Sequence, residues 1–325
     1  MLKDLQTHQV TVRQIDQITP SVKRFTLVAA DGAFLPAFSG GSHILVHMKQ
    51  GQERYTNAYS LMNSPAHSDH YQIGVLQEAH SKGGSTYLHQ QVKVGDTLDV
   101  SAPKNLFGLA YNAHKHLLIA GGIGITPMLS QLEELIIRQA DYQLHYAFQN
   151  KERGPFAGEL QTGPHQSRCR MYARDEGQRL DVDALLSGVE AHTHVYVCGP
   201  ARLTAAVLAA AQKYRIAAEQ IHTEQFGATV TEQTGNGDFI VTLARSGKQV
   251  SVASGTTILS ALEKSGLADI PFLCRSGVCG TCETAILEGV AEHCDQYLTG
   301  EEKAANKTMM VCVSRSRSAK LVLDL

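Results

Sequence analysis

Residues 274–282 read CRSGVCGTC, which places three cysteines at C-x4-C-x2-C spacing, and a fourth cysteine lies far downstream. The four are Cys274, Cys279, Cys282 and Cys312. Plant-type ferredoxins hold a [2Fe–2S] cluster with this spacing. Gly277 and Gly280 allow the positive φ angles that a loop needs in order to wrap a cluster and aim its N–H groups at the sulfurs. We therefore expect the four cysteines to be the cluster ligands.

The alternatives for these cysteines are a zinc site or buried free thiols. Zinc sites favour a C-x2–4-C pair together with a second close pair, whereas Cys312 has no close partner, so the spacing favours the iron–sulfur cluster. Cys169 and Cys294 lack any ligand spacing and are expected to be ordinary thiols. The chain has 7 cysteines, and this odd number argues against a disulfide framework.

The sequence around the cysteine motif indicates a separate α+β domain over residues 238–325. The run FIVTLARSGKQVSV has the pattern of a hairpin that turns at Ser246 and Gly247. The run TILSALEKSG has the pattern of a helix that ends at Gly266. Residues 227–237, GATVTEQTGNG, are rich in Thr, Gly and Asn, and we interpret them as a linker.

Residues 111–226 show the alternating strand and helix patterns of a doubly wound α/β domain. HLLIA is an apolar run of the kind that forms a buried parallel strand, and PMLSQLEELIIRQ follows it with apolar residues at helical spacing. The alternation continues through LHYAF, a helix over residues 180–186, HVYVC and ARLTAAVLAAAQKY. Alternation of this length predicts a parallel sheet with helices on both faces.

Two turns that follow strands of this domain together favour a dinucleotide site. In GGIGITP (121–127), Thr126 is expected at the helix N-cap and Pro127 at the first helical position, so that the helix N-terminus faces a pyrophosphate. The turn is not the G-x-G-x-x-G fingerprint, and a tight turn without a ligand is the alternative. CGP (198–200) follows a later strand and belongs to the same edge of the sheet.

Residues 1–110 contain recurrent short β-rich runs, such as VTVRQI, KRFTLVA and YQIGVL, which predict an antiparallel barrel or sandwich. One predicted strand places Asn57 and Tyr59 on one face and Arg54 on the other. SKGGST (81–86) leads into a short helix with Ser85 as the expected cap, and it offers a site for one phosphate. For both segments the alternative is structural, because barrel aromatics are commonly core and such turns commonly only start a helix.

The composition excludes several classes of protein. Lys and Arg total 29 against 31 Asp and Glu, a net charge of −2, whereas nucleic-acid and anionic-membrane binders usually carry a basic excess. No apolar run reaches the roughly 18–20 residues that span a bilayer, and MLKDLQTHQV lacks the apolar segment of a signal peptide. We therefore expect no nucleic-acid partner, no membrane segment and a cytoplasmic location.

Three motifs in this order, NAYSL with GGST, GGIGITP with CGP, and CRSGVCGTC with a late cysteine, resemble those of the phthalate dioxygenase reductase family. The resemblance covers essentially the whole chain. It implies a flavin-binding β-barrel over residues 1–110, an NAD-binding domain over 111–226 and a β-grasp ferredoxin domain over 238–325. It also implies FMN, NADH and a [2Fe–2S] cluster as cofactors. The runs CETAILEG and LVLDL are most similar to the carnitine monooxygenase branch of the family.

The same resemblance implies which residues contact the cofactors. The implied nucleotide contacts are Gly122, Gly124, Ile125, Thr126, Pro127, Cys198, Gly199 and Pro200. The implied flavin contacts are Arg54, Asn57, Ala58, Tyr59, Ser60, Gly83, Gly84, Ser85, Thr86 and Phe226. Asn57 stands where the family has an arginine, so Arg54 or Lys82 is expected to supply that charge. Residues 147–150 contain no arginine for a 2′-phosphate, which favours NADH over NADPH.

These expectations combine into an electron-transfer chain. NADH gives up two electrons as a hydride, and a flavin can pass them one at a time to an iron–sulfur cluster. The resemblance implies that the final acceptor is a separate oxygenase of Rieske type. Two alternatives stay open: a reductase for a non-Rieske acceptor such as a diiron hydroxylase, and a redox sensor or electron carrier that has lost its flavin.

Overall fold

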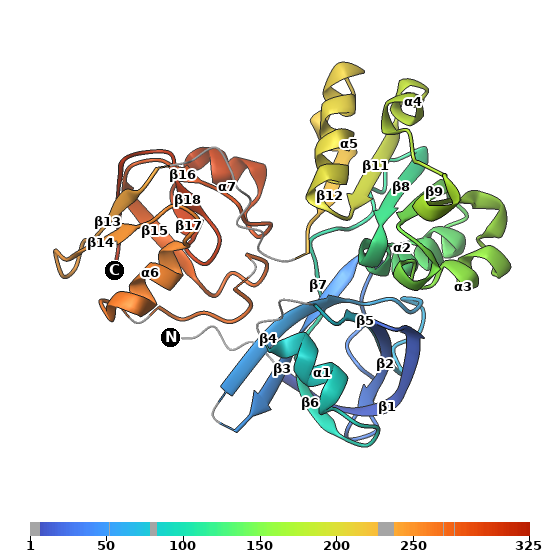
Figure 1. The fold of residues 1–325 in the computed structure, drawn as a ribbon, viewed down its shortest axis with the longest axis horizontal. Helices are drawn as coiled ribbons and strands as arrows, with labels where there is room; N and C mark the ends of the chain where they lie inside the picture. The colour runs from blue at the N-terminus through green and yellow to red at the C-terminus, as the bar shows by residue number, and fades with distance from the viewer. Residues whose placement is uncertain (1–6, 52, 79–82, 227–236, 269, 276) are drawn as a thin grey trace. The chain divides into compact units, whose positions relative to one another are not determined.

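A computed structural model describes residues 7–325 except 52, 79–82, 227–236, 269 and 276 (Figure 1). The described chain divides into two compact units, the N-terminal unit (residues 7–225) and the C-terminal unit (residues 226–325). Residues 227–236 of the expected linker therefore lie outside the described residues.

The N-terminal unit begins with an antiparallel barrel, as predicted. The bounds are β1 Thr7–Thr19, β2 Val22–Ala29, β3 Ser42–Gln50, β4 Glu53–Ser60, β5 Tyr71–Leu76, β6 Thr97–Ser101, β7 Lys104–Asn105 and α1 Gly84–Gln90. The strand order is β4-β3-β6-β1-β2-β5, with β7 paired to β3. A bridge between Leu61 and Ile73 links the end of β4 to β5. Val10, Phe25 and Ile44 are completely buried in the interior, because alternate side chains of each strand face inward.

The second sheet of the N-terminal unit is parallel, which confirms the predicted doubly wound fold. Its strands are β8 Lys115–Gly121, β9 Asp141–Phe148, β10 Cys169–Ala173, β11 Thr193–Cys198 and β12 Ile221–Glu224, in the order β10-β9-β8-β11-β12. Its helices are α2 Thr126–Ile137, α3 Ala157–Thr162, α4 Val182–Ser187 and α5 Ala201–Lys213. Leu132 and Leu160 pack α2 and α3 on one face, and Leu186 and Val207 pack α4 and α5 on the other.

Some elements of this sheet differ from the sequence prediction. The pattern does not predict β10, β12 or α3, because the two strands lie at the sheet edges and the helix has only 6 residues. The GGIGI turn is a 3-10 helix, Gly122–Ile125, that runs directly into α2. Thr126 consequently lies inside the helix, and its hydroxyl donates to the Ile123 carbonyl at 3.0 Å. The prediction of Thr126 as the N-cap was wrong.

The C-terminal unit has the predicted β-grasp arrangement of a helix against a mixed sheet. Its bounds are β13 Phe239–Leu243, β14 Gln249–Val252, β15 Glu283–Glu288, β16 Ala291–Glu292, β17 Thr308–Met310, β18 Arg315–Ser316, β19 Lys320–Leu323, α6 Ile258–Ser265 and α7 Gly300–Ala305. The main sheet has the order β14-β13-β19-β15-β17, with β13 and β19 parallel, and β16 pairs with β18. α6 contributes Leu259 and Leu262 to the core and ends at Gly266, which has φ 62° as the helix pattern requires.

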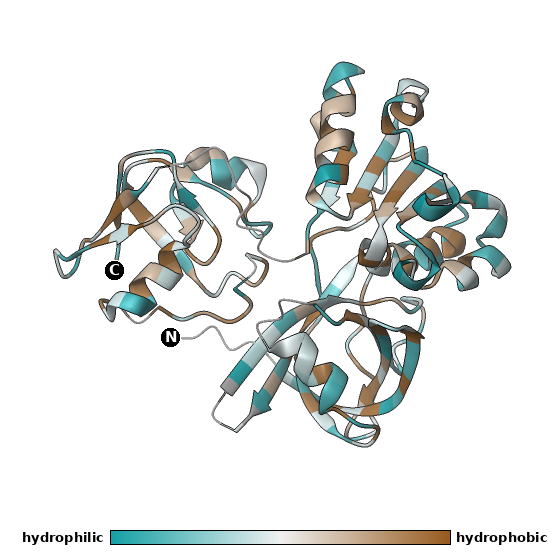
Figure 2. Ribbon diagram, in the orientation of Figure 1, coloured by the Kyte–Doolittle hydropathy of each residue, from teal (hydrophilic) through white to brown (hydrophobic). Residues whose placement is uncertain are grey.

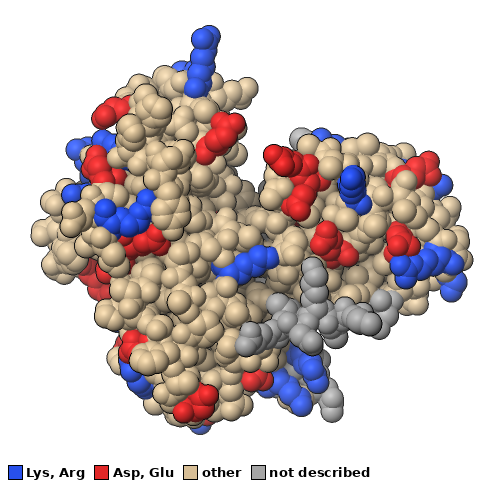
Figure 3. Space-filling model, turned by 180° about the vertical axis from the view of Figure 1, so that it is seen from behind, with Lys and Arg blue, Asp and Glu red and all other residues tan. Residues whose placement is uncertain are grey.

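Figure 2 shows frequent hydrophobic residues on β8 and β11, the central strands of the parallel sheet. On the face drawn in Figure 3, acidic and basic side chains are interspersed. Within the residues that the structure describes, no helix combines the length and apolarity needed to cross a membrane.

Candidate functional site

The flavin motif lies where α1 packs on β4. Asn57 and Tyr59 share a face of β4 as predicted, and Asn57 Nδ2 donates to the Tyr59 hydroxyl at 3.0 Å. A Cβ atom on Gly84 would lie 2.6 Å from Asn57 Nδ2, and one on Gly83 would overlap the ring of Tyr55. Glycine at both positions therefore lets the first turn of α1 lie directly against β4.

Ser60 contributes a buried hydroxyl to this surface. Ser60 is 4% exposed, and its hydroxyl has no hydrogen-bond partner among the described residues. Buried polar groups nearly always have a hydrogen-bond partner, and a bound molecule with a polar edge would supply one for the Ser60 hydroxyl. Burial raises the pKa of Tyr59 to about 12, so its phenol stays neutral. The surface thus offers a neutral aromatic ring beside an unsatisfied hydroxyl.

The phosphate end of the flavin motif differs from the prediction in one respect. The N-cap of α1 is Gly83, and no side chain caps the helix. Ser85 therefore lies within the first turn and is not the cap, and its hydroxyl accepts a hydrogen bond from the Glu78 N–H at 3.4 Å. Thr86 follows it and is partly buried, as is Ala58 on β4.

The charge that replaces the family arginine at Asn57 is still a prediction. Arg54 is exposed at the start of β4, and Lys82 lies outside the described residues. Phe226 is the first residue of the C-terminal unit, and its side chain is 40% exposed. A contact between Phe226 and the flavin likewise stays a prediction.

The two predicted nucleotide turns are brought together by the parallel pairing of β8 and β11, which sets Cys198 opposite Ala120. A Cβ atom on Gly124 would overlap the carbonyl oxygen of Cys198. A Cβ atom on Gly199 would lie 3.0 Å from the Cα of Gly121. The turns therefore form one glycine-lined surface at the carboxyl edge of the sheet, which is where ligands bind in open α/β folds.

The other predicted nucleotide contacts start the helices beside this surface. Gly122 has φ 54° and begins the 3-10 turn, and Ile125 ends it. Pro127 lies in the first turn of α2, where its missing N–H costs nothing, and Pro200 is the N-cap of α5. The 3-10 turn that leads into α2 begins at Gly122, and α5 begins after Pro200; both begin at the same sheet edge, so the surface fits a pyrophosphate.

Glu224 is a residue of this surface that the motifs do not reveal. It ends β12 opposite Cys198, it is 6% exposed, and its Oε2 has no hydrogen-bond partner among the described residues. Burial raises the pKa of Glu224 to about 8, and burial together with Glu224 raises the pKa of the Cys198 thiol. Both groups are therefore mostly protonated at neutral pH. No sequence signal marks Glu224, because β12 reads IHTE and contains only one apolar residue.

The barrel and the nucleotide turns meet along a seam formed by α2. A Cβ atom on Gly74 of β5 would lie 2.8 Å from Cγ2 of Thr126, so this glycine permits the close approach. Further along α2, Gln131 Nε2 donates to the Phe107 carbonyl at 2.6 Å. The seam holds the start of α2 beside the barrel strand that follows the flavin motif.

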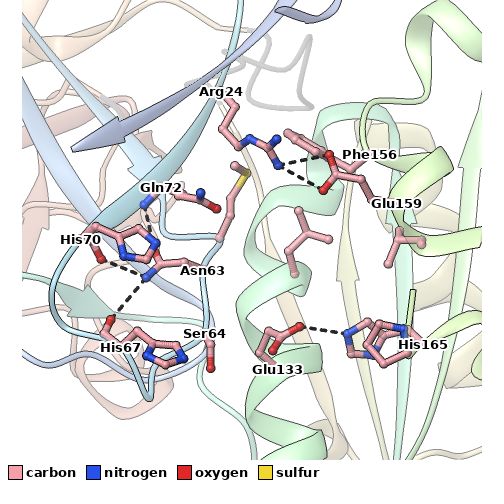
Figure 4. A pocket seen from close by; sticks show the side chains of 14 residues that line it. Arg24, Asn63, Ser64, His67, His70, Gln72, Glu133, Phe156, Glu159 and His165 are labelled. Atoms are coloured by element: carbon pink, nitrogen blue, oxygen red, sulfur yellow. Dashed lines mark hydrogen bonds and ion pairs between the residues drawn. The ribbon is translucent and has the colours of Figure 1, made fainter. Parts of the chain in front are cut away.

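A hollow of about 320 Å³ lies along this seam between β2, β5, α2 and α3 (Figure 4). Across it, Arg24 Nη1 lies 3.1 Å from each carboxylate oxygen of Glu159. His165 Nε2 lies 3.2 Å from Glu133 Oε1. Because these polar groups pair with one another across the hollow, we interpret it as part of the packing between the barrel and the helices α2 and α3.

The sheet edge at β10 places an arginine near residues 147–150, where the sequence alone indicated no arginine for a 2′-phosphate. β10 lies beside β9, and Arg174 follows β10 in the 3-10 helix Arg174–Glu176. The N–H of Asp175 donates to the Gln149 carbonyl at 3.0 Å, so an arginine and two carboxylates stand next to residues 147–150. A hollow of about 810 Å³ opens there, lined in part by Phe148 and Glu176. The absence of arginine from residues 147–150 is therefore not sufficient by itself to indicate a preference for NADH over NADPH.

The four predicted cluster ligands form two pairs in the C-terminal unit. The Cys274 side chain raises the pKa of the Cys279 thiol and the Cys312 side chain lowers the pKa of the Cys282 thiol, so the two members of each pair are neighbours. In the described part of the chain, no group of three or more His, Cys, Asp or Glu side chains gathers around a single metal position. Two cysteine pairs fit a cluster with two irons, in which each iron takes one pair.

The ligand loop has the predicted backbone. Gly277 and Gly280 have φ angles of 72° and 80°. A Cβ atom on Gly277 would lie 2.7 Å from Cγ2 of Val313, so this glycine lets the loop pack closely against the turn that carries Cys312. Cys279 is partly exposed, whereas the other three cysteines of the motif are buried.

Three family models match the chain in the order of these sites. They are described as an oxidoreductase FAD-binding domain over residues 9–108, an oxidoreductase NAD-binding domain over 118–208, and a 2Fe-2S iron-sulfur cluster binding domain over 241–317. The fold and its sites thus define an NADH-dependent flavin and iron–sulfur oxidoreductase.

The chain belongs to the phthalate dioxygenase reductase family. It matches the solved structure of phthalate dioxygenase reductase with a TM-score of 0.73 and 33% identity over 98% of each chain. It is 49% identical to the carnitine monooxygenase reductase subunit of Escherichia coli (strain K12), over 100% of each chain. It is 42% identical to the heme-dependent oxidative N-demethylase beta subunit of Ectopseudomonas mendocina (strain ymp), over 97% of this chain and 98% of the relative.

Proposed function

We propose that this chain is the reductase component of a two-component oxygenase and passes electrons from NADH through FMN and a [2Fe–2S] cluster to a separate oxygenase. The observation that carries the proposal is the presence of two cysteine pairs in the same chain as the glycine-lined nucleotide surface. Full-length similarity to reductase subunits supports it.

A bound flavin would accept a hydride and release single electrons, which is the exchange that NADH and a one-electron cluster require. The chain's own residues hold and orient the cofactors. Tyr59 supplies an aromatic face and Ser60 a hydroxyl for the ring edge, and the first turn of α1 takes the phosphate. The proposed flavin residues are Arg54, Asn57, Ala58, Tyr59, Ser60, Gly83, Gly84, Ser85, Thr86 and Phe226. We propose domain limits of 1–110, 111–226 and 238–325.

The nucleotide surface is proposed to favour NADH over NADPH. The carboxylates of Asp175 and Glu176 follow β10 and would repel a 2′-phosphate, although Arg174 stands beside them. The specificity constants for NADH and NADPH, measured with ferricyanide as acceptor, test this preference. Equal constants would contradict it.

The acceptor is proposed to be a Rieske-type oxygenase that oxidises carnitine or a similar quaternary amine. The name of the Escherichia coli relative supports carnitine as the substrate of the partner. A second candidate acceptor is a haem protein, because the Ectopseudomonas mendocina relative is named as part of a heme-dependent N-demethylase. Substrate turnover with each purified oxygenase component, driven by this protein and NADH, separates the two.

We place the protein in the cytoplasm. None of the seven cysteines, all of which lie in the described part of the chain, forms a disulfide, and thiols and cluster ligands persist in a reducing compartment. Fractionation of the native cells, followed by detection of the protein, tests the location.

The central experiment uses the purified holo-protein under anaerobic conditions. Flavin and iron–sulfur absorbance should be present, heat should release FMN, and NADH should bleach both chromophores. The reduced cluster should give the electron paramagnetic resonance (EPR) signal of a [2Fe–2S] centre. The proposal fails if NADH leaves the flavin and the cluster oxidised, or if the protein is colourless.

A further inference from the structure

Asp295 is a buried carboxylate in the C-terminal unit. It lies between the loop that carries Cys274, Cys279 and Cys282 and the turn that carries Cys312. Its side chain is 0% exposed, and it belongs to none of the cofactor motifs. A buried carboxylate is costly unless other groups replace its hydration, so its neighbours show what it does.

Hydrogen bonds and one cation offset that cost. The Leu298 N–H donates to Oδ2 at 2.8 Å, and the Ser314 hydroxyl donates to Oδ1 at 3.3 Å. Lys303 Nζ lies 3.9 Å from Oδ2 and donates to the backbone carbonyl of Asp295 at 2.6 Å. His293 Nδ1 lies 3.6 Å from Oδ1. Asp295 and Lys303 thus form an ion pair whose carboxylate has no contact with solvent.

The backbone at Asp295 supports the ligand loop. A Cβ atom on Gly277 would lie 3.0 Å from Cα and 3.1 Å from Cβ of Asp295, so these two residues pack without any gap. The Gln296 N–H donates to the Gly277 carbonyl at 3.0 Å. A Cβ atom on Gly277 would also lie 2.7 Å from Cγ2 of Val313, the residue after Cys312, so residues 295 and 296 hold the glycine that packs against the turn of this ligand.

The side chain of Asp295 reaches the other part of the framework. Ser314 follows the Cys312 turn and is 0% exposed. Its hydroxyl donates to Asp295 and accepts from the Cys294 N–H at 3.2 Å. One residue therefore connects the loop of residues 274–282 with the turn that carries the fourth cysteine.

We propose that Asp295, balanced by Lys303, is a positioning residue that sets the reduction potential of the iron–sulfur cluster and slows its loss. This inference rests on the proposed ligand set. A cluster gains negative charge when it is reduced, so a buried carboxylate nearby disfavours the reduced form and a nearby cation favours it. Asp295 therefore lowers the potential, and Lys303 raises it.

The test compares variants of the full-length holo-protein by EPR-monitored redox titration. Asp295→Asn should raise the reduction potential of the cluster, and Lys303→Met should lower it. Lys303→Arg keeps the charge and should leave the potential unchanged. The matched control is Asp324→Asn, which removes a 42% exposed carboxylate paired with Arg245 in the same unit and should also leave it unchanged.

Cluster loss is measured separately, as the bleaching of iron–sulfur absorbance by a chelator. Asp295→Asn should lose its cluster roughly 10-fold faster than the wild type or more, which is the size of effect expected when the support of a metal ligand is removed. The Asp324→Asn control should lose its cluster at the wild-type rate.

Opposite shifts of the reduction potential in Asp295→Asn and Lys303→Met support the proposal. If the two residues only supported the loop sterically, the direction of the shift would not depend on the charge that is removed. Shifts in the same direction, or potentials that match the Asp324→Asn control, overturn it. If Asp295→Asn cannot hold a cluster, Lys303→Met and Lys303→Arg decide, and an unchanged potential in Lys303→Met overturns the proposal. A wild-type protein without a [2Fe–2S] signal would instead refute the proposed function.

Discussion

Gly124 lies directly against the carbonyl oxygen of Cys198, so the turn after β8 and the turn after β11 touch through backbone atoms. A side chain at position 124 would force the two turns apart. The nucleotide surface depends on both turns, so its geometry depends on this one contact.

Gly124→Ala should weaken NADH binding without removing the flavin. Overpacking of this kind costs about 1–3 kcal/mol, and about 1.4 kcal/mol corresponds to a tenfold change in affinity. We expect the dissociation constant for NADH to rise roughly tenfold. The dependence of flavin reduction kinetics on NADH concentration measures this constant, and titration with the oxidised nucleotide gives the corresponding constant for that form. Gly188→Ala is the matched control, because a Cβ atom there meets open space. Unchanged NADH affinity in Gly124→Ala would contradict the site.

Ser60→Ala should weaken flavin binding and leave the flavin-free protein as stable as before. The hydroxyl has no partner among the described residues, so its removal costs the apo-protein no hydrogen bond. The lost bond to the flavin should cost about 1 kcal/mol. Flavin fluorescence titration and denaturant unfolding of the apo-protein measure the two effects.

Ser101→Ala is the control for that prediction, and it should show the opposite behaviour. The Ser101 hydroxyl accepts from the Leu45 N–H at 3.0 Å and donates to the Ala102 carbonyl at 2.8 Å. Its removal should lower the free energy of unfolding by about 1–2 kcal/mol and leave flavin affinity unchanged. Equal flavin affinity in Ser60→Ala and the wild type would remove Ser60 from the flavin site.

Glu224→Gln should change how stability depends on pH. The pKa of Glu224 is about 8 in the folded protein and near 4.5 when unfolded, so between these values the folded state binds more protons. Its contribution to stability is therefore complete below about pH 4.5 and is lost as pH rises through 8. The melting temperature of Glu224→Gln should exceed that of the wild type increasingly from pH 5 to pH 9. Glu219→Gln, at an exposed position, is measured in parallel as the control, and a difference in melting temperature that stays constant with pH in Glu224→Gln would contradict the prediction.

Cys312→Ser should remove the iron–sulfur signal and leave flavin reduction by NADH intact. Cys312 is a proposed cluster ligand in the C-terminal unit, whereas the proposed flavin and nucleotide residues, apart from Phe226, belong to the N-terminal unit. Cys294→Ser is the control, because this thiol is exposed and outside both pairs. EPR and anaerobic absorbance spectra check both variants, and loss of the cluster in Cys294→Ser would refute the ligand assignment.

Local patterns predicted the elements that carry the motifs, and they failed where a neighbouring segment decides the outcome. The run HLLIA is a strand because its apolar residues are continuous, and β8 spans Lys115–Gly121. By contrast, Thr126 has the chemistry of an N-cap but lies inside a helix, because the glycines before it adopt a 3-10 turn. The sequence pattern does not place Arg174 beside residues 147–150, because this position follows from the pairing of β10 with β9.

The sequence by itself determined the central strands of the parallel sheet, the spacing of the cysteines and the glycine turns, because each depends on residues close together in the chain. Only the tertiary structure decided which groups meet. Cys282 pairs with Cys312, Gly124 touches Cys198, and Asp295 connects the ligand loop to Ser314. These contacts join segments far apart in sequence, and they arise from strand order and close packing, which no local pattern encodes.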